Sequence, residues 1–326
     1  MHGGRFIRCA AIFSALGAFV LFSSVIFREA TSSPGVGFTF STEYARSLGL
    51  EPQEVLSAAL EDFDPAFVRV PLYWKDIEPT RGVFSWEEMD EVVELIRAEE
   101  RTIHMVMGAK VPRWPECFIP SWVMTHDRLA YEETLLSSFR IMVSRYASSV
   151  DVWQIENEPF FPFGDCPETS LALLREEVAL IRELDPSASL QFTVSGEQQM
   201  WTSVAPLADR VGVSMYRSAR NAWFGAFTFP VPSWWYILMR FPLLHTHEVV
   251  ISELQMEPWF VSHPRFIDPG VAASYFTPRH ARDAFTYARS TGFSEISFWG
   301  VEWWYYLREH GYPGLWDAMK DLIGDV

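Results

Sequence analysis

The feature that most constrains the fold of this chain is a regular alternation of apolar segments with amphipathic helical segments. The apolar segments are rich in β-branched and aromatic residues, as strands buried on both faces are. We predict eight such strands, at residues 35–41, 67–74, 102–108, 150–159, 189–195, 210–216, 248–254 and 295–299. Apolar residues at helical spacing predict helices between them, including residues 54–61, 131–146, 171–184, 281–290 and 316–323.

Eight strands that alternate with helices are typical of an α/β protein with a (β/α)8 barrel, the TIM barrel. The length of 326 residues and the 49% hydrophobic content suit one large core. An open doubly wound sheet is the alternative, but no Gly-rich phosphate loop follows the first strand. We therefore predict a single barrel domain over residues 35–326.

Residues 223–244 are unusually apolar and aromatic. We interpret this segment as the sixth helix of the barrel with its loop. A membrane-facing patch is the alternative interpretation.

The N-terminal segment predicts a membrane anchor. Residues 9–27 contain no charged residue and follow Arg5 and Arg8. This length is close to the ~20 residues of one membrane-spanning helix, and the basic flank predicts a cytoplasmic N-terminus with the remaining chain outside. We predict a cytoplasmic tip and transmembrane signal anchor over residues 1–30, a short linker at 31–34, and an extracytoplasmic domain. Cleavage of a signal peptide and secretion is the alternative.

The charge balance limits the classes of partner. The formal net charge is −16, and without residues 1–30 the chain has 23 basic and 41 acidic residues, or −18. This balance argues against nucleic acid or an anionic membrane surface as the main partner. It permits a neutral substrate such as a glycan, and it leaves the oligomeric state open.

Two glutamates follow buried strands at matching positions. The fourth strand ends in Asn157-Glu158-Pro159, and Pro159, which has no N–H, is expected to end the ladder and to hold Glu158 extended. The seventh strand delivers Glu253, 253 − 158 = 95 residues later, which matches three βα units of ~31 residues. Catalytic groups of parallel barrels lie at the carboxyl ends of strands. Glu257 is the rival to Glu253.

With these two acids, the sequence resembles retaining glycoside hydrolases of the (β/α)8 clan that includes cellulase-type (family 5-like) enzymes, β-galactosidases and xylanases. The resemblance implies a carbohydrate substrate, Glu158 as general acid/base, Glu253 as nucleophile, and no cofactor. The chain departs from the clan at His104, which is mid-strand, and at Ser214-Met215-Tyr216, where members often carry His-x-Tyr.

The resemblance also implies substrate-binding residues. Arg69 would brace the nucleophile, and an Arg inside an apolar strand needs an acidic partner in any case. The other candidates are a hydroxyl-binding amide, a tyrosine beside the nucleophile and aromatic platforms: Asn157, Tyr216, Trp299, Trp303 with Trp304, and Trp114. For any single Trp, core packing is the alternative.

Other chemistries have little support in the sequence. The eight His are scattered, and His-Glu-x-x-His is absent, so we predict no metal site. A transglycosidase or a non-catalytic glycan-binding barrel remains an alternative function.

Cys117 and Cys166 lie in the loops after the third and fourth strands, which should be adjacent. A disulfide between them is therefore predicted, with two free thiols as the alternative.

Overall fold

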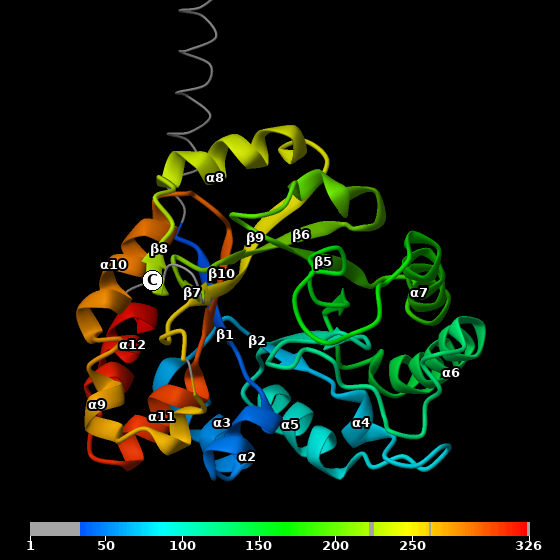
Figure 1. Cartoon of the computed structure of the whole chain (residues 1–326), viewed down its shortest axis with the longest axis horizontal. Helices are drawn as coiled ribbons and strands as arrows, with labels where there is room; N and C mark the ends of the chain where they lie inside the picture. The colour runs from blue at the N-terminus through cyan, green and yellow to red at the C-terminus, as the bar shows by residue number, and fades with distance from the viewer. Residues whose placement is uncertain (1–32, 222–224, 261, 325–326) are drawn as a thin grey trace, which may run out of the picture.

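The centre of the molecule is a closed barrel of eight parallel strands (Figure 1). The computed structural model describes residues 33–221, 225–260 and 262–324. Each barrel strand pairs with the next barrel strand along the chain, and the last pairs with the first in register from Gly35–Glu295 to Thr39–Trp299. The predicted (β/α)8 barrel is therefore confirmed.

The barrel strands are β1 (Gly35–Thr39), β2 (Phe67–Pro71), β3 (Thr102–Met107), β4 (Val152–Ile155), β5 (Ser189–Ser195), β6 (Arg210–Met215), β9 (Glu248–Gln255) and β10 (Glu295–Trp299). The α-helices are α2 (Thr42–Leu48), α3 (Pro52–Phe63), α4 (Trp74–Ile77), α5 (Glu87–Ala98), α6 (Arg128–Tyr146), α7 (Leu171–Leu184), α8 (Ser233–Arg240), α9 (Pro269–Ala273), α10 (Pro278–Arg289), α11 (Val301–Glu309) and α12 (Gly314–Gly324).

Two connections differ from the regular pattern. Between β5 and β6 the chain forms two short 3₁₀ turns, η1 (Trp201–Ser203) and η2 (Ala205–Leu207), in place of a helix. After β6 comes an antiparallel hairpin of β7 (Ser218–Asn221) and β8 (Gly225–Thr228).

Residues 223–244 are therefore not simply one helix with its loop. Pro230 and Pro232 disfavour helical conformation in the residues before them, which delays the start of α8 to Ser233. The turn η3 (Phe241–Leu243) follows α8 directly.

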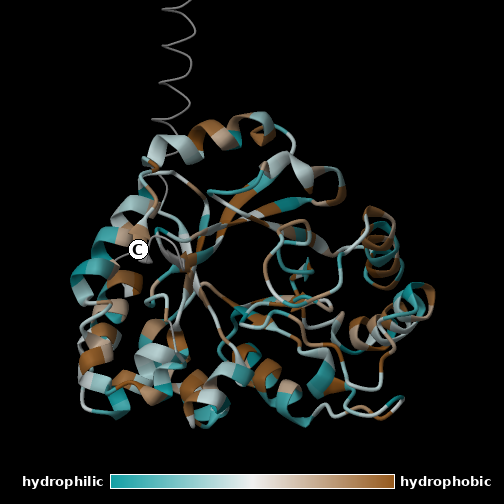
Figure 2. Ribbon diagram, in the orientation of Figure 1, coloured by the Kyte–Doolittle hydropathy of each residue, from teal (hydrophilic) through white to brown (hydrophobic). Residues whose placement is uncertain are grey.

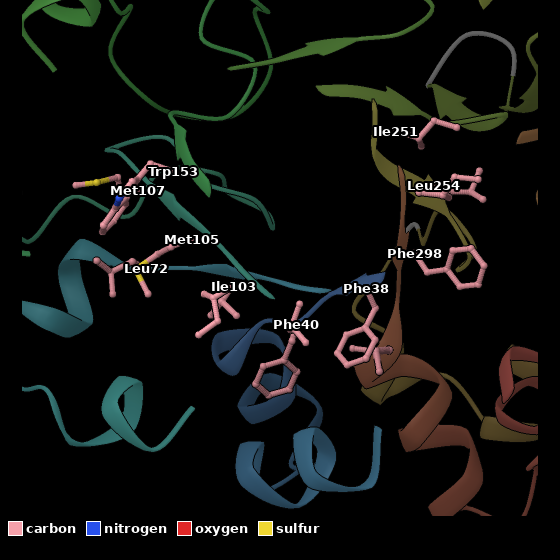
Figure 3. Close-up of a cluster of buried hydrophobic side chains, with 14 of the residues drawn as sticks. Phe38, Phe40, Leu72, Ile103, Met105, Met107, Trp153, Ile251, Leu254 and Phe298 are labelled. Carbon is pink, nitrogen blue, oxygen red and sulfur yellow. The ribbon is translucent and has the colours of Figure 1, made fainter. Parts of the chain in front are cut away.

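The barrel wall separates an apolar outer layer from a polar interior. Figure 3 shows apolar side chains from the strands, among them Phe38, Met105 and Phe298, which are fully buried in the main core. Successive strand residues point to opposite faces, so their neighbours line the inside of the barrel. There Thr39 hydrogen-bonds Ser297 across 3.0 Å. The polar side chains inside the barrel can therefore form hydrogen bonds with charged groups at its mouth.

The predicted anchor, residues 9–27, lies outside the described residues. Among the helices that the structure describes, none is long and apolar enough to cross a membrane.

Candidate active site

Glu158 follows β4 at the mouth of the barrel, in a tight turn of the chain. Both Glu156 and Glu158 have positive φ, 53° and 45°, so the prediction that Pro159 holds Glu158 extended is wrong. The Glu156 side chain holds its own part of the turn: its Oε1 and Oε2 accept hydrogen bonds from Ala109 N and Lys110 N, at 2.9 and 2.6 Å. These bonds from the loop after β3 stabilise a left-handed conformation that residue preference alone disfavours.

The Glu158 side chain is held from the neighbouring strands. Its Oε1 accepts a hydrogen bond from Ser214 Oγ on β6, at 2.6 Å. Its backbone N–H donates to Thr193 Oγ1 on β5, at 2.9 Å. The carboxyl is 6% exposed. Burial raises the pKa of Glu158 to about 7, and the negative charge of Glu253 adds to the increase, while Ser214 opposes it.

Glu253 lies within β9 and has a different environment. Its Oε1 accepts a hydrogen bond from Arg69 Nη1 at 2.8 Å, and its Oε2 accepts one from the Tyr216 hydroxyl at 3.2 Å. Glu253 and Arg69 are both buried, with exposures of 4% and 1%. The two acids thus differ in partner, since Glu253 pairs with a cation and Glu158 with a neutral hydroxyl.

Arg69 connects the acids to the polar lumen. Its Nε donates to Gln154 Oε1 at 2.8 Å, and its Nη2 lies 3.4 Å from Asn157 Oδ1. Asn157 Nδ2 donates to Glu116 Oε1 at 3.3 Å. Asn157 is therefore fixed between Arg69 and Glu116, and its amide donates to a carboxyl that we did not predict from the sequence.

The loop after β3 supplies three buried charged residues missed at the sequence level. Lys110 Nζ donates to the backbone oxygens of Glu158 and Phe161, at 3.1 and 2.9 Å. Glu116 is buried against Asn157, and burial together with the charge of Glu158 raises its pKa well above the usual value. A signal was present: Lys110, Arg113 and Glu116 recur every three residues in a proline-rich loop.

A disulfide joins this loop to the one after β4. Cys117 and Cys166 are bonded, with their Cα atoms 4.8 Å apart. The predicted pairing of these two cysteines is confirmed. The bridge ties the segment that carries Glu116 to the segment that follows Glu158.

Arg113 fills the space beside Trp299. Its guanidinium lies 4.0 Å from the centre of the Trp299 ring and 3.8 Å from that of Tyr44. It also pairs with Glu257 at 2.5 Å and with Glu302 at 2.7 Å. The rival acid Glu257 thus lies in a separate buried ion cluster. Trp299 is therefore covered by the Arg113 guanidinium on one side and is 6% exposed as a whole.

The remaining predicted aromatic residues differ in their accessibility. Trp303 and Trp304 are fully buried; Trp303 packs on Phe260 and Tyr306, and the Trp304 indole donates to the Met256 carbonyl. The prediction that they extend a sugar platform is wrong, because both belong to the core.

Trp114, in contrast, is 66% exposed at the rim. Its ring lies 5.6 Å from that of Phe163, which lies 6.0 Å from that of Trp259. Trp259 lies 6.0 Å from Tyr216. Aromatic rings therefore continue from the rim to the tyrosine that holds Glu253.

Residues 33–221, 225–260 and 262–324 contain no group of three or more His, Cys, Asp or Glu side chains that could hold a metal ion. The fold and the site together define a (β/α)8 barrel with a buried pair of carboxyl groups at its mouth.

Solved structures of carbohydrate-active enzymes share this barrel. The exo-beta-1,4-mannosidase Op5Man5 from Opitutaceae bacterium strain TAV5 matches with a TM-score of 0.58 and 16% identity, over 82% of this chain and 52% of that one. A psychrophilic glycoside hydrolase family 10 endo-beta-1,4-xylanase matches with 0.52 and 14%, over 84% and 89%. A beta-galactosidase from the haloarchaeon Halorubrum lacusprofundi matches with 0.53 and 16%, over 81% and 52%. The chain thus spans about half the length of the mannosidase and the galactosidase. No family model matches the chain.

Proposed function

We propose that this protein is a retaining glycoside hydrolase that cleaves O-glycosidic bonds of a poly- or oligosaccharide. The observation that carries the proposal is the buried pair of glutamates in contrasting environments. Burial and the charge of Glu253 raise the pKa of Glu158 to about 7, which suits an acid that holds its proton at neutral pH. Glu253, paired with Arg69 at 2.8 Å, suits a carboxylate that attacks. The barrel shared with solved glycosidases supports the assignment.

In this mechanism, Glu253 attacks the anomeric carbon while Glu158 protonates the departing glycosidic oxygen. The product of this step is a glycosyl ester of Glu253 and the free leaving alcohol. Glu158, now ionised, then takes a proton from water as the water attacks the anomeric carbon. This second step breaks the ester, releases the sugar with its original configuration and returns both acids to their starting states.

Arg69, Asn157 and Tyr216 act as positioning and binding residues in this proposal. Arg69 and Tyr216 donate to the two oxygens of Glu253, which fixes the direction of attack. Asn157 is held by Glu116 beside the acids and would meet a sugar hydroxyl. Trp299, which is 6% exposed, and Trp114 at the rim would contact sugar rings.

A transglycosidase on the same scaffold is the second candidate. Both acids are almost fully buried, and the aromatic ring of Trp259 lies against the tyrosine that holds Glu253. Such enclosure disfavours water as the acceptor and favours a second sugar.

We also propose that residues 9–27 anchor the domain on the extracytoplasmic side of a membrane. The support is the uncharged run after Arg5 and Arg8. A disulfide between Cys117 and Cys166 suits an oxidising compartment.

The test of the catalytic assignment is a panel of aryl glycosides with wild type, Glu158→Gln and Glu253→Gln. Each variant should lose most turnover, and Glu158→Gln should keep more of the first step with an activated phenol leaving group, which needs less protonation. NMR of the first product should show retained configuration. Glu248→Gln, on the same strand as Glu253 but exposed at the other end, is the matched control. Near wild-type activity in either catalytic variant, or an inverted product, contradicts the assignment.

A further inference from the structure

Helix α8 and the turn η3 carry a stripe of exposed apolar side chains. Trp234, Leu238 and Phe241 are 59%, 45% and 60% exposed. Their spacing of four and three residues puts them on one face of the helix. Tyr236 and Arg240 are buried on the opposite face. Figure 1 shows α8 at the outer edge of the molecule, and in Figure 2 part of this helix has the brown colour of hydrophobic residues.

The sequence segment around the stripe lacks acidic residues, and Glu197 meets α8 at Tyr236 on the buried face. Residues 210–247 contain no Asp or Glu, although the chain as a whole has a net charge of −16. Tyr236, Arg240, His245 and His247 are the titratable residues of α8 and the loop that follows, and of these Tyr236 and Arg240 are buried. An exposed apolar helix face that carries Trp, in a segment without acidic residues, suits a helix that lies in a membrane interface.

The end of α8 lies at the end of the barrel where β1 begins. Gly35 N donates to the Ser294 carbonyl at 2.8 Å, and Arg240 Nη1 donates to the Gly292 carbonyl at 3.2 Å. The start of β1 and the end of α8 therefore meet at the same loop before β10. This loop is at the amino end of the strands, opposite the mouth that carries the acids.

The linker is short enough to keep this end at a membrane. Residues 28–34 separate the uncharged run from Gly35, and seven extended residues reach at most ~25 Å. Helix α8, with eight residues, is ~12 Å long. An anchor over residues 9–27 therefore confines α8 to a zone that includes the bilayer surface.

We propose that Trp234, Leu238 and Phe241 insert into the interface of the lipid bilayer in which residues 9–27 are anchored. This inference rests on the proposed anchor. The net charge of the domain disfavours attraction to anionic lipids, so the contact is apolar, with zwitterionic lipid as its partner. It gives the barrel a fixed orientation, with the α8 flank on the membrane and the mouth at the end away from the linker.

The test uses the full chain in phosphatidylcholine nanodiscs that contain a phospholipid with a photoreactive diazirine near the glycerol backbone. After illumination, peptide mass spectrometry should find lipid cross-links in residues 9–27 and in the peptide that contains α8 and η3. The double change Trp234→Ser with Phe241→Ser should lose the α8 cross-links and retain those of the anchor.

The matched control makes the same kind of change elsewhere. Leu129, on α6, and Phe266 are 73% and 83% exposed, and Leu129→Ser with Phe266→Ser should leave the α8 cross-links unchanged. If the double α8 variant fails to fold, the wild-type cross-link map still shows whether α8 contacts lipid.

Three outcomes overturn the proposal, and they are distinguishable. Lipid cross-links confined to residues 9–27 would uphold the anchor and refute the α8 contact. Absence of lipid cross-links, with a soluble chain that begins after about residue 30, would refute the anchor itself. A bifunctional protein cross-linker added to the same nanodiscs would decide the third outcome: links between the α8 peptides of two chains would show that a second copy of the chain covers this face.

Discussion

Replacement of Ser214 by alanine tests whether the environment of Glu158 sets its role. Ser214 lies on β6, is 4% exposed, and donates its hydroxyl to Glu158 Oε1 at 2.6 Å. This hydrogen bond stabilises the ionised carboxylate and lowers the pKa of Glu158 against the larger effect of burial. The serine-to-alanine change removes the hydroxyl with little change of volume, so the fold should persist.

The structure gives the sign and the size of the expected effect. A hydrogen bond to a charged group contributes about 1.5–3 kcal/mol, and one pKa unit corresponds to about 1.4 kcal/mol, so complete loss would raise the pKa of Glu158 by about 1–2 units. The hydroxyl can also accept a hydrogen bond from the neutral carboxyl, which offsets part of this difference. We therefore expect the pKa of Glu158 to rise by about one unit, from about 7 to about 8.

The measurement is the pH dependence of kcat/KM on an unactivated glycoside. In the proposed mechanism activity requires protonated Glu158, so the basic limb of the profile would report its pKa in the free enzyme, and the limb should move to higher pH. Ser252→Ala is the control, because Ser252 is a buried strand serine whose hydroxyl has no hydrogen-bond partner in the described part of the chain. A folded, active Ser214→Ala enzyme whose basic limb stays in place or moves to lower pH would refute the reasoning.

Further predictions concern stability and topology. As pH rises from 4.5 to about 7, the contribution of Glu158 to the free energy of unfolding should fall by up to about 3 kcal/mol, because its pKa is higher in the folded state than in the unfolded state. Urea titrations of wild type and Glu158→Gln measure this difference. Arg69→Met should cost about 3–5 kcal/mol in the same assay by leaving a buried carboxylate unpaired; an unchanged midpoint would contradict this. Denatured, unreduced full-length chain should show one free thiol, since Cys117 and Cys166 are bonded; three free thiols would exclude the bridge. A spanning helix over residues 9–27 should keep the protein in the membrane fraction at high salt; mature protein in the soluble fraction would indicate cleavage.

The barrel could be predicted because its signals are local and repeated. The bounds predicted for the strands at 189–195 and 295–299 and for the helix at 171–184 agree with the structure, because each has a uniform apolar pattern and a clear end. The elements with mixed signals were the ones missed. Residues 223–244 have enough apolar residues for one helix, but Pro230 and Pro232 divide them.

The lining of the site depends on contacts between distant segments, which periodicity does not encode. Arg113 reaches Glu302 across 189 residues of sequence, and Glu116 reaches Asn157 across 41. Trp303 and Trp304 follow a strand that ends at the mouth, but the helix that carries them turns both rings into the core. Two adjacent tryptophans are suitable residues for a sugar platform, but packing in the core sets the orientation of their side chains.

The contrast between the two acids follows from the placement of one cation. Arg69 comes from β2 and donates to Glu253 on β9 at 2.8 Å, whereas Ser214 is the described side-chain donor to the Glu158 carboxyl. Two buried carboxyl groups at one mouth disfavour simultaneous ionisation unless a positive charge compensates one of them. Arg69 lies against Glu253, so its charge compensates a carboxylate there, while burial, with the charge of Glu253 added to it, raises the pKa of Glu158. In the proposed mechanism, the position of this single arginine inside the barrel would distinguish the nucleophile from the acid, and an exchange of these roles would require moving that charge.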